Sequence, residues 1–405
     1  MTRTAKTRIV CISDTHNQTP SLPKGDVLVC AGDVTNQGTV REVERFVRWV
    51  EKTDFEVRVV VGGNHDITLD ESFYEEHWRS FHNQGKQSTQ ECRALLKNSP
   101  SITYLQHESA AIKLSSPTGP HTQFSIFGSP YSPAHNLWAF GYEPDAAKAL
   151  WDEIPLETDV VVTHTPPAGH CDQQISKNNR AGCEELRRRL WAVRPLLHVC
   201  GHIHEGRGVE KVTWKDSIDR APFLEESIEI WTDPGGGEGN RKQSLVKLTT
   251  GRGNGNGVPL IPPPTTTTTT TAAAAKSIGG VKRAGKASYS GPGKGGLPSE
   301  KQLDSLSLID SKKARIKNSL NHSYRNAIRD VARRSLEEED HGWNTGTGGE
   351  TLVLESRISR DEVRWGRRET CIVNAAIMAK NWGERGSKRF NKPIVVDVDL
   401  PVWEE

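Results

Sequence analysis

The 405-residue sequence lacks several features that would each mark a class of protein. It has no run of about 18 apolar residues, which excludes a membrane-spanning helix. The apolar run at residues 9–12 is too short for the core of a signal peptide. The seven cysteines are odd in number and show no Cys-X-X-Cys spacing, so no disulfide framework is expected. We therefore expect a cytoplasmic protein, with the nucleus as the alternative.

A large excess of charge of one sign is also missing. The 53 lysines and arginines nearly balance the 51 aspartates and glutamates, which leaves a formal net charge of +2. A protein that holds nucleic acid or an anionic membrane by bulk charge needs a larger excess. We therefore expect no membrane as a partner, and the oligomeric state stays open.

Composition divides the chain into three parts. Residues 1–233 alternate apolar runs with amphipathic stretches, and residues 369–405 contain β-branched runs at 371–377 and 393–398. Residues 234–368 include a tract rich in Gly, Pro, Thr and Lys, which cannot bury enough apolar surface to offset its chain entropy. Because two strands alone form no core, we expect the last strands to complete the first domain around a long, mostly disordered insertion.

Within the expected insertion, residues 241–299 carry basic residues but no acidic one. The favoured interpretation is a flexible, solvated tether. The less favoured alternative is nuclear localisation or a weak contact with nucleic acid through Lys282, Arg283 and Lys286. No aromatic residue beyond Tyr289 lies among these basic residues, so stacking on single-stranded nucleic acid is not expected.

Strands and helices are predicted to alternate along residues 1–233. Strands are predicted at the apolar runs 7–13, 26–31, 56–61, 102–104, 123–127, 159–163 and 197–200. Helices are predicted at 39–52, 69–81, 144–151 and 183–193, the first from the helical spacing of its valines. This alternation predicts an α/β fold with buried, largely parallel strands.

Five of the apolar runs end in a polar cluster. The clusters are Asp14-Thr15-His16, Gly32-Asp33, Gly63-Asn64-His65-Asp66, His164 and Gly201-His202-Ile203-His204. Because the carboxyl ends of strands in an open α/β sheet line one crevice, we expect these clusters to meet. Imidazoles and oxygen ligands without thiolate suit first-row ions such as Mn, Fe or Zn. Seven such ligands are too many for one ion and suit two ions that share a carboxylate.

In order and spacing, these motifs resemble those of the calcineurin-like metallophosphoesterases. The resemblance covers residues 7–210 and 369–402. It is closest to the branch of metallophosphoesterase-domain-containing proteins related to class III cyclic-nucleotide phosphodiesterases, through residues 13–16, the Pro166-Pro167 pair, residues 201–206 and the last strands. The fold that it implies is a calcineurin-like four-layer α/β/β/α sandwich, interrupted by the insertion.

The resemblance also implies a role for each residue of the motifs. Metal ligands would be Asp14, His16 and His204 for a first ion, Asn64, His164 and His202 for a second, and Asp33 as the bridge. His65 would contact the phosphate, and Asp66 would orient His65. The cofactor would be two divalent or mixed-valence ions (Mn, Fe or Zn) that lower the pKa of a bridging water, whose hydroxide attacks a small phosphoester. The implied substrates are phosphodiesters, either cyclic nucleotides or small aryl diesters.

Several alternatives remain open from the sequence. A phosphomonoesterase, including a protein Ser/Thr phosphatase, would use the same site. A catalytically idle scaffold would bind partners through the insertion, although its core would then be expected to have lost ligands, and none is missing. Asp66 can also cap a helix that begins near Ile67.

Residues outside these motifs receive weaker interpretations. His170 and Asp172 follow the Pro166-Pro167 turn and are tentative substrate contacts at the mouth of the site. Packing in the core is expected for His198, Cys11, Cys30 and Cys200. His135 receives no role, and Trp138, Trp151 and Trp191 are interpreted as core or half-buried aromatics.

Overall fold

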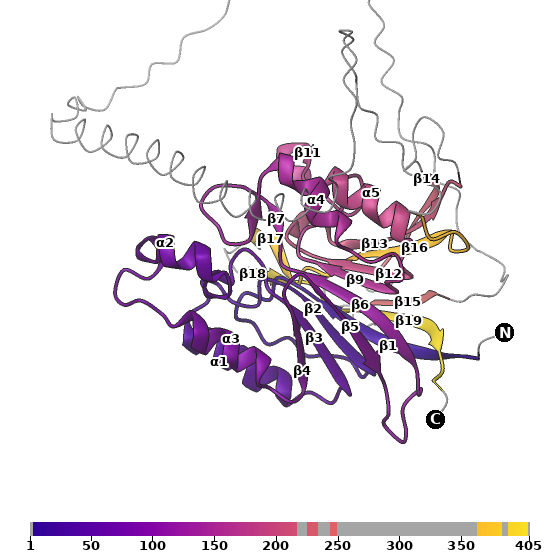
Figure 1. The fold of residues 1–405 in the computed structure, drawn as a ribbon, viewed down its shortest axis with the longest axis horizontal. Coiled ribbons are helices and arrows are strands. Elements are labelled where there is room, and N and C mark those ends of the chain that lie inside the picture. The colour runs from indigo at the N-terminus through magenta and orange to yellow at the C-terminus, as the bar shows by residue number, and fades with distance from the viewer. Residues whose placement is uncertain (1–2, 217–224, 234–243, 249–362, 383–387, 404–405) are drawn as a thin grey trace, which may run out of the picture. The chain divides into compact units, whose positions relative to one another are not determined.

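The computed structural model describes residues 3–216, 225–233, 244–248, 363–382 and 388–403 (Figure 1). These residues belong to one compact unit, which comprises Met1–Pro259 and Leu354–Glu405. Most of the predicted insertion, including the basic group around Lys282, lies outside the described residues.

Two mixed β-sheets form the centre of this unit. The six-stranded sheet has the order β15-β19-β1-β2-β3-β4, formed by Ser244–Leu248, Ile394–Pro401, Thr4–Ile12, Val27–Ala31, Val57–Val61 and Ile102–Leu105. The seven-stranded sheet has the order β14-β13-β16-β12-β9-β6-β5, formed by Glu225–Ile230, Gly208–Trp214, Glu369–Asn374, Leu197–Cys200, Val160–Thr163, Gln123–Ser129 and Glu108–Lys113. Most neighbouring strands of these two sheets pair in parallel, as expected, and their antiparallel pairs are β1 with β19, β13 with β16, β13 with β14, and β5 with β6.

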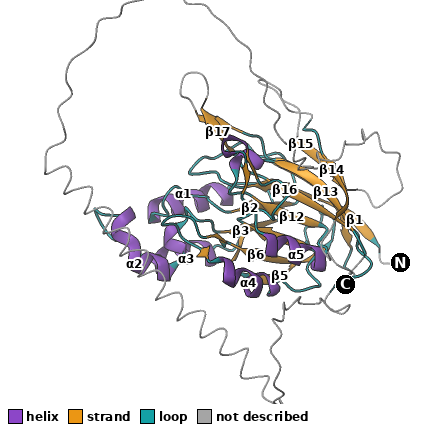
Figure 2. Cartoon of the chain, turned by 90° about the horizontal axis from the view of Figure 1, so that it is seen from above, coloured by secondary structure: helices purple, strands orange, loops and turns teal. Residues whose placement is uncertain are grey.

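Helices cover the outer face of each sheet (Figures 1 and 2). On the six-stranded sheet, α1 (Val40–Glu51) and α3 (Thr89–Lys97) bury residues such as Phe46 and Leu96 against the strands. On the seven-stranded sheet, α4 (Ala147–Asp152) and α5 (Glu184–Val193) contribute Trp151 and Trp191 to the core. A further apolar cluster, with residues such as Ile9, Val59, Ile126 and Val199, lies between the sheets. The predicted four-layer α/β/β/α sandwich is therefore confirmed.

Local sequence signals explain where the helices begin. In α1, Thr39 accepts from the backbone N–H of Glu42, whose side chain accepts from the backbone of Thr39 in return. This capping box places the helix within one residue of the predicted range. α2 (Glu71–Phe81) begins two residues later than predicted, because Asp70 serves as its N-cap.

The chain beyond the predicted insertion supplies a strand to each sheet. β16 lies between β12 and β13, and β19 lies between β1 and β15. One described stretch inside the range assigned to the insertion is also ordered: β15 pairs in parallel with β19, from Ser244 opposite Ile394 to Leu248 opposite Val398. β15 was not predicted, because its five residues lie next to a Gly- and Pro-rich tract.

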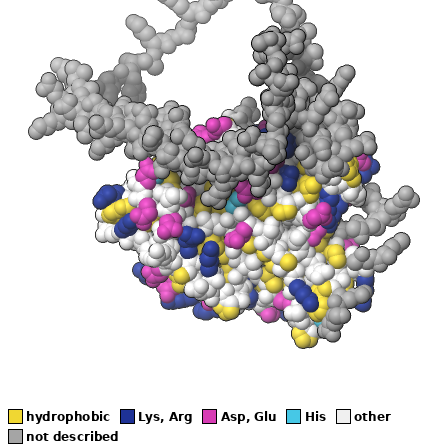
Figure 3. Space-filling model, in the orientation of Figure 1, with side chains coloured by type: hydrophobic (Ala, Val, Ile, Leu, Met, Phe, Trp, Pro, Cys, Tyr) yellow, Lys and Arg dark blue, Asp and Glu magenta, His cyan; other side chains and the backbone are white. Residues whose placement is uncertain are grey.

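No helix in the described ranges is long and apolar enough to cross a membrane. On the face drawn in Figure 3, acidic and basic side chains of the described residues are interspersed. This distribution matches the near balance of charge in the sequence.

Candidate metal centre

Loops at the carboxyl ends of the strands meet, and backbone hydrogen bonds hold them side by side. The N–H of Asp14 donates to the carbonyl of Gly32 over 2.9 Å, and the N–H of Gly201 donates to the carbonyl of His164 over 3.0 Å. These bonds join loops within each of the two sheets. Contacts among the side chains bring together all seven predicted metal ligands: Asp14, His16, Asp33, Asn64, His164, His202 and His204.

Several of these loops contain strained backbone. Four predicted ligands have a left-handed backbone that non-glycine residues rarely adopt, with φ of 51° at Asp14, 43° at His16, 52° at Asp33 and 64° at His202. Each such residue costs free energy of folding, and strained residues cluster at functional sites. The other eight such residues in the described ranges are not predicted ligands, and strain at these four fits a site that the surrounding fold holds in place.

Two glycines allow carboxylates to approach the neighbouring loops. A Cβ atom on Gly63 would lie 2.4 Å from Asp33 Oδ1, and one on Gly201 would lie 2.2 Å from Asp14 Oδ2. Both distances are far shorter than a normal contact. Gly63 and Gly201 are therefore required for this arrangement of ligands.

The first group of candidate ligands contains Asp14, His16 and His204, whose ligand atoms all lie within 4.8 Å of one another. His204 Nε2 lies 3.2 Å from Asp14 Oδ1. Burial alone would raise the pKa of Asp14, but His204 and His164 lower it to about 2. Asp14 is therefore a carboxylate at neutral pH, ready to bind a cation.

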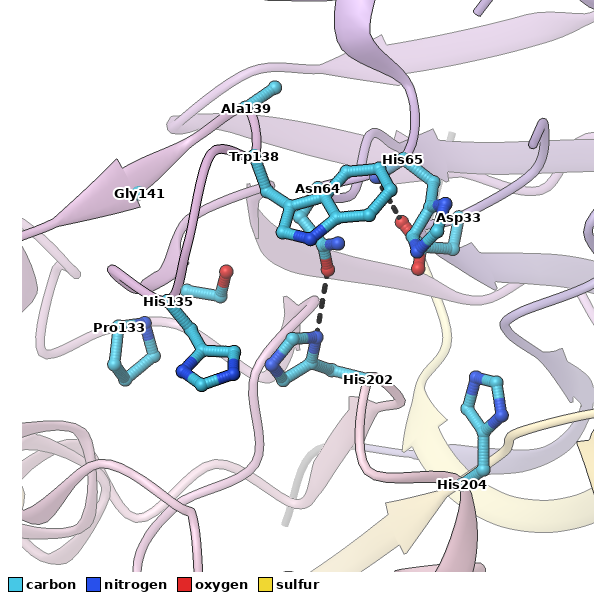
Figure 4. Close-up of a pocket in the computed structure, with 11 residues that line it drawn as sticks. Asp33, Asn64, His65, Pro133, His135, Trp138, Ala139, Gly141, His202 and His204 are labelled. Carbon is cyan, nitrogen blue, oxygen red and sulfur yellow. Dashed lines mark hydrogen bonds between the residues drawn. The ribbon is translucent and has the colours of Figure 1, made fainter. Parts of the chain in front are cut away.

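The second group centres on the side-chain amide of Asn64. Its Oδ1 lies 3.0 Å from His164 Nε2 and 2.8 Å from His202 Nδ1, the latter contact drawn in Figure 4. His164 Nδ1 lies 2.9 Å from the carbonyl of Ala31, which only accepts, so Nδ1 carries the proton. Because the pKa of His164 is raised to about 9, Nε2 also carries a proton at neutral pH and donates it to Asn64 Oδ1. A cation bound by both atoms would take the place of that proton.

Asp33 lies between the two groups. Its Oδ1 is 3.4 Å from His164 Nε2, and its Oδ2 is 3.7 Å from His16 Nε2. Burial would raise the pKa of Asp33, but His164 and His65 lower it well below its usual value. In turn, Asp33 overcomes the effect of burial on His164 and raises the pKa of that imidazole to about 9. A carboxylate with one oxygen facing each group has the geometry of a bridge.

The donor set fits first-row metal ions. Ligands at roughly 2.1 Å from an ion lie about 3.0–3.4 Å from one another, close to the spacings between imidazole nitrogens and oxygens found here. All the donors are carboxylate or amide oxygens and imidazole nitrogens. Cys30 and Cys200 are buried in strands, and burial raises the pKa of both thiols, so neither offers a thiolate.

His65 lines a pocket of about 230 Å³ beside the candidate ligands (Figure 4). Its Nδ1 lies 2.9 Å from the carbonyl of Asn36 and therefore donates to it. That bond leaves Nε2 available to a substrate. The sequence pattern gave no sign of the contact, because the acceptor is a backbone carbonyl.

Asp66 is fully buried and acts on the loops around His65. Its carboxylate accepts from the backbone N–H groups of Thr35 (2.8 Å) and Gly63 (2.9 Å), and from the Thr35 hydroxyl (2.7 Å). Asp66 was expected to orient His65, and its hydrogen bonds instead reach the loops that carry Thr35 and Gly63. Its side chain makes no cap bond to the short helix at Ile67–Leu69. Burial and the nearby Asp33 raise the pKa of Asp66 to about 6.

The two tentative substrate contacts lie away from the pocket. His170 is buried, with Nδ1 2.8 Å from Glu210 and Nε2 3.1 Å from Glu225. Asp172 is also buried and accepts from the N–H groups of Gly169 and Gly182. Both side chains are thus saturated by contacts within the fold. The structure contradicts their assignment to the mouth of the site.

The loop that follows β6 supplies a wall of the pocket that the sequence analysis did not assign. The loop residues that line the pocket are Ser132, Pro133, His135, Trp138, Ala139 and Gly141. His135 had received no role, and Trp138 had been interpreted as a core or half-buried aromatic. This loop also follows the carboxyl end of a strand, so the rule that located the ligands could have located it.

Cys11, Cys30, Cys200 and His198, which were expected to pack in the core, are buried there. All seven cysteines are free and buried. His198 is buried, with Nε2 2.9 Å from the hydroxyl of Thr163.

Comparison with known proteins agrees with this geometry. Residues 7–206 match the model of the calcineurin-like phosphoesterase family. Metallophosphoesterase domain-containing protein 1 of Homo sapiens is 36% identical over 214 residues, which cover 50% of this chain and 62% of that protein. UPF0046 protein C25E10.12 of Caenorhabditis elegans is 31% identical over 217 residues, covering 50% of this chain and 71% of that protein.

A protein of Emericella nidulans named probable rhamnogalacturonate lyase C is 40% identical over 216 residues, 53% of this chain but only 18% of that protein. The chain thus spans less than two thirds of the length of the human and fungal relatives. The family match includes every predicted ligand, from Asp14 to His204. The chain belongs to the calcineurin-like phosphoesterase family.

Proposed function

We propose that this protein hydrolyses phosphoesters with the help of two metal ions, and that phosphodiesters such as cyclic nucleotides or small aryl diesters are its substrates. One observation carries the proposal: two groups of ligands meet on either side of Asp33. Asp14, His16 and His204 would hold one ion, and Asn64, His164 and His202 the other. Asp33 would bind both. Mn, Fe and Zn are the candidate ions.

When bound, the ions lower the pKa of a coordinated water and withdraw charge from the phosphate oxygens. The protein holds its ligands in a buried, pre-formed arrangement, so little reorganisation is needed. Asp66 contributes by fixing the loops that carry Asp33 and Asn64. His65 lies beside the ligands with Nε2 free, and it donates to a phosphoryl oxygen or protonates the leaving oxygen.

The charge of the pocket supports diesters over monoesters. Among the described residues that line it, none is Lys or Arg. A phosphomonoester carries up to two negative charges near neutral pH, whereas a diester carries one. Beyond the proposed ions and the imidazoles, the pocket therefore has no lysine or arginine to meet the second charge of a monoester.

The test compares two chromogenic esters on the full chain loaded in turn with Mn, Fe or Zn. We expect bis(p-nitrophenyl) phosphate to turn over faster than p-nitrophenyl phosphate with at least one metal. Faster hydrolysis of the monoester would overturn the diester assignment and favour a phosphomonoesterase. No turnover of either ester with any metal would favour a catalytically idle scaffold.

A further inference from the structure

A short segment beyond the predicted insertion links the loops that carry the candidate ligands. It begins at Asn374, the last residue of β16, and continues to Met378. Ala375 accepts from the N–H of Ser13 over 3.0 Å and donates to the carbonyl of Cys200 over 2.8 Å. Met378 N–H donates to the carbonyl of Asp14 over 3.2 Å. The segment therefore joins the end of β1 in one sheet to the end of β12 in the other.

The side chain of Asn374 faces the loop that carries His202 and His204. Its Nδ2 lies 2.9 Å from the carbonyl of Ile203 and 3.4 Å from that of Gly201. The same nitrogen lies 3.0 Å from the carbonyl of Cys171, and Oδ1 accepts from the N–H of Ala376. Asn374 is fully buried, so water cannot replace these bonds.

The contacted carbonyls fix the conformation of the ligand loop. Gly201 and Ile203 are the residues on either side of His202, and Ile203 directly precedes His204. His202 has the strained left-handed backbone, with φ of 64°, which needs support from its surroundings. The amide of Asn374 has two hydrogens, and its two shorter contacts are with the carbonyls of Ile203 and Cys171, so it holds chiefly the peptide plane between Ile203 and His204.

We propose that Asn374 is a positioning residue for metal binding, so that affinity for the ions depends on a residue that follows the insertion. The inference rests on the proposed metal centre, but it concerns binding and not hydrolysis. Asn374 would act through the His202–His204 loop without touching an ion. Residues that orient metal ligands in this way typically contribute about 10–100-fold to metal affinity.

Thr370 offers a matched control on the same strand. It is fully buried, and its hydroxyl lies 2.9 Å from Trp214 Nε1, so Thr370→Val also removes a buried hydrogen bond from β16. That bond lies at the opposite end of the strand from Asn374. A purely structural role for Asn374 predicts that both variants affect stability and neither affects metal affinity selectively.

The experiment titrates Mn²⁺ into the metal-free full chain and follows free Mn²⁺ by electron paramagnetic resonance. Asn374→Ala should weaken binding by about 10-fold or more, whereas Thr370→Val should stay within roughly 2-fold of the natural protein. The Mn²⁺ affinity of Asn374→Ser, whose hydroxyl keeps one donor, should lie between those of Asn374→Ala and the natural protein. Asn374→Ser replaces the alanine variant in the comparison if that variant does not fold. All variants are measured at one temperature, at least about 10 °C below the lowest Tm among them.

Unchanged Mn²⁺ affinity in the folded Asn374 variants would overturn the inference, and so would an equal loss in Thr370→Val. Either result leaves the proposed hydrolysis intact. Conversely, a chain that binds Mn²⁺ in an Asn374-dependent manner but hydrolyses no phosphoester would refute the proposed function alone.

Discussion

The imidazole of His65 packs against the indole of Trp138, with ring centroids 4.0 Å apart and ring planes at 35°. The other side of His65 is fixed by the bond from Nδ1 to the carbonyl of Asn36. Together these contacts leave His65 little freedom to rotate. Figure 4 shows Trp138 beside His65 at the edge of the pocket.

Removing the indole should loosen His65. We expect Trp138→Ala to lower kcat by about 2–10-fold, since such aromatic contacts contribute about 0.5–1.5 kcal/mol. Trp138→Phe keeps a ring in contact and should retain most of the rate. Steady-state kinetics on an aryl diester would measure both variants, and an unchanged kcat in Trp138→Ala would contradict this role.

His65 itself should matter most when the leaving group is poor. We expect His65→Ala to keep its metal ions but to lose about 10²–10⁴-fold in rate, because a general acid is missing. The deficit should shrink for esters whose leaving group needs no proton. Rates for a series of aryl diesters with graded leaving-group pKa measure how the deficit depends on the leaving group. A uniform loss across the series would instead indicate that His65 only binds the phosphate.

The shared carboxylate should control how many ions bind. Asp33→Asn removes the charge that faces both groups, and His204→Ala removes a ligand from one of them. We expect both variants to lose turnover, with fewer bound ions per chain than the natural protein. Elemental analysis after dialysis gives the number of metal ions bound per chain.

Treatment of the natural protein with a chelator should abolish activity, and added Mn²⁺ should restore it.

A single methyl group on Gly201 should displace a ligand. The Cβ of Gly201→Ala would lie 2.0 Å from Ser13 Oγ and 2.2 Å from Asp14 Oδ2, so both Ser13 and Asp14 must move. We expect metal affinity to fall by at least about 10-fold. Gly85→Ala is the control, because its Cβ would meet nothing within 4 Å. Equal Mn²⁺ affinity in the two variants would show that Asp14 is free to adjust.

The buried cluster of His170, Glu210 and Glu225 should make stability depend on pH. Burial would raise the pKa of Glu225, but His170 and Arg187 lower it to about 2, so its contribution is lost as the pH falls from about 4.3 towards 2. Burial would lower the pKa of His170, but Glu210 and Glu225 raise it. The contribution of His170 is therefore complete below about 6.5 and is lost as the pH rises through its raised pKa.

His170→Gln should then lower Tm most near pH 5–6 and progressively less as the pH rises through the raised pKa of His170. The expected loss in that window is about 2 kcal/mol, or roughly 5 °C. Thermal melts of the variant and the natural protein across this range measure the difference. A constant difference at all pH values would mean that the charge of His170 does not contribute.

The sequence was most informative where an apolar strand ends in a polar residue. Asp14, Asp33, Asn64 and His164 each follow such a strand, and a general property of α/β sheets predicted that they would meet. The period of helix α1 and its Thr39 cap were equally clear. These features depend on neighbours in the chain, which the sequence displays directly.

Features that depend on distant contacts were missed. The edge strand β14 exposes most of its side chains, so it lacks the apolar pattern of a buried strand. The hydrogen bond from His65 to the carbonyl of Asn36 could not be predicted, because every residue type has a backbone carbonyl. His170 was misplaced because its partners, Glu210 and Glu225, lie 40 and 55 residues further along the chain.

The order of strands has a consequence for synthesis on the ribosome. β1 and β12 each need a neighbour, β19 and β16 respectively, that is translated only after residue 368. At about 5–20 residues per second, the stretch between β13 and β16 delays these neighbours by roughly 8–30 s. During that interval the nascent polypeptide presents open β-edges at β1, β12 and β13, which makes it a natural client for chaperones.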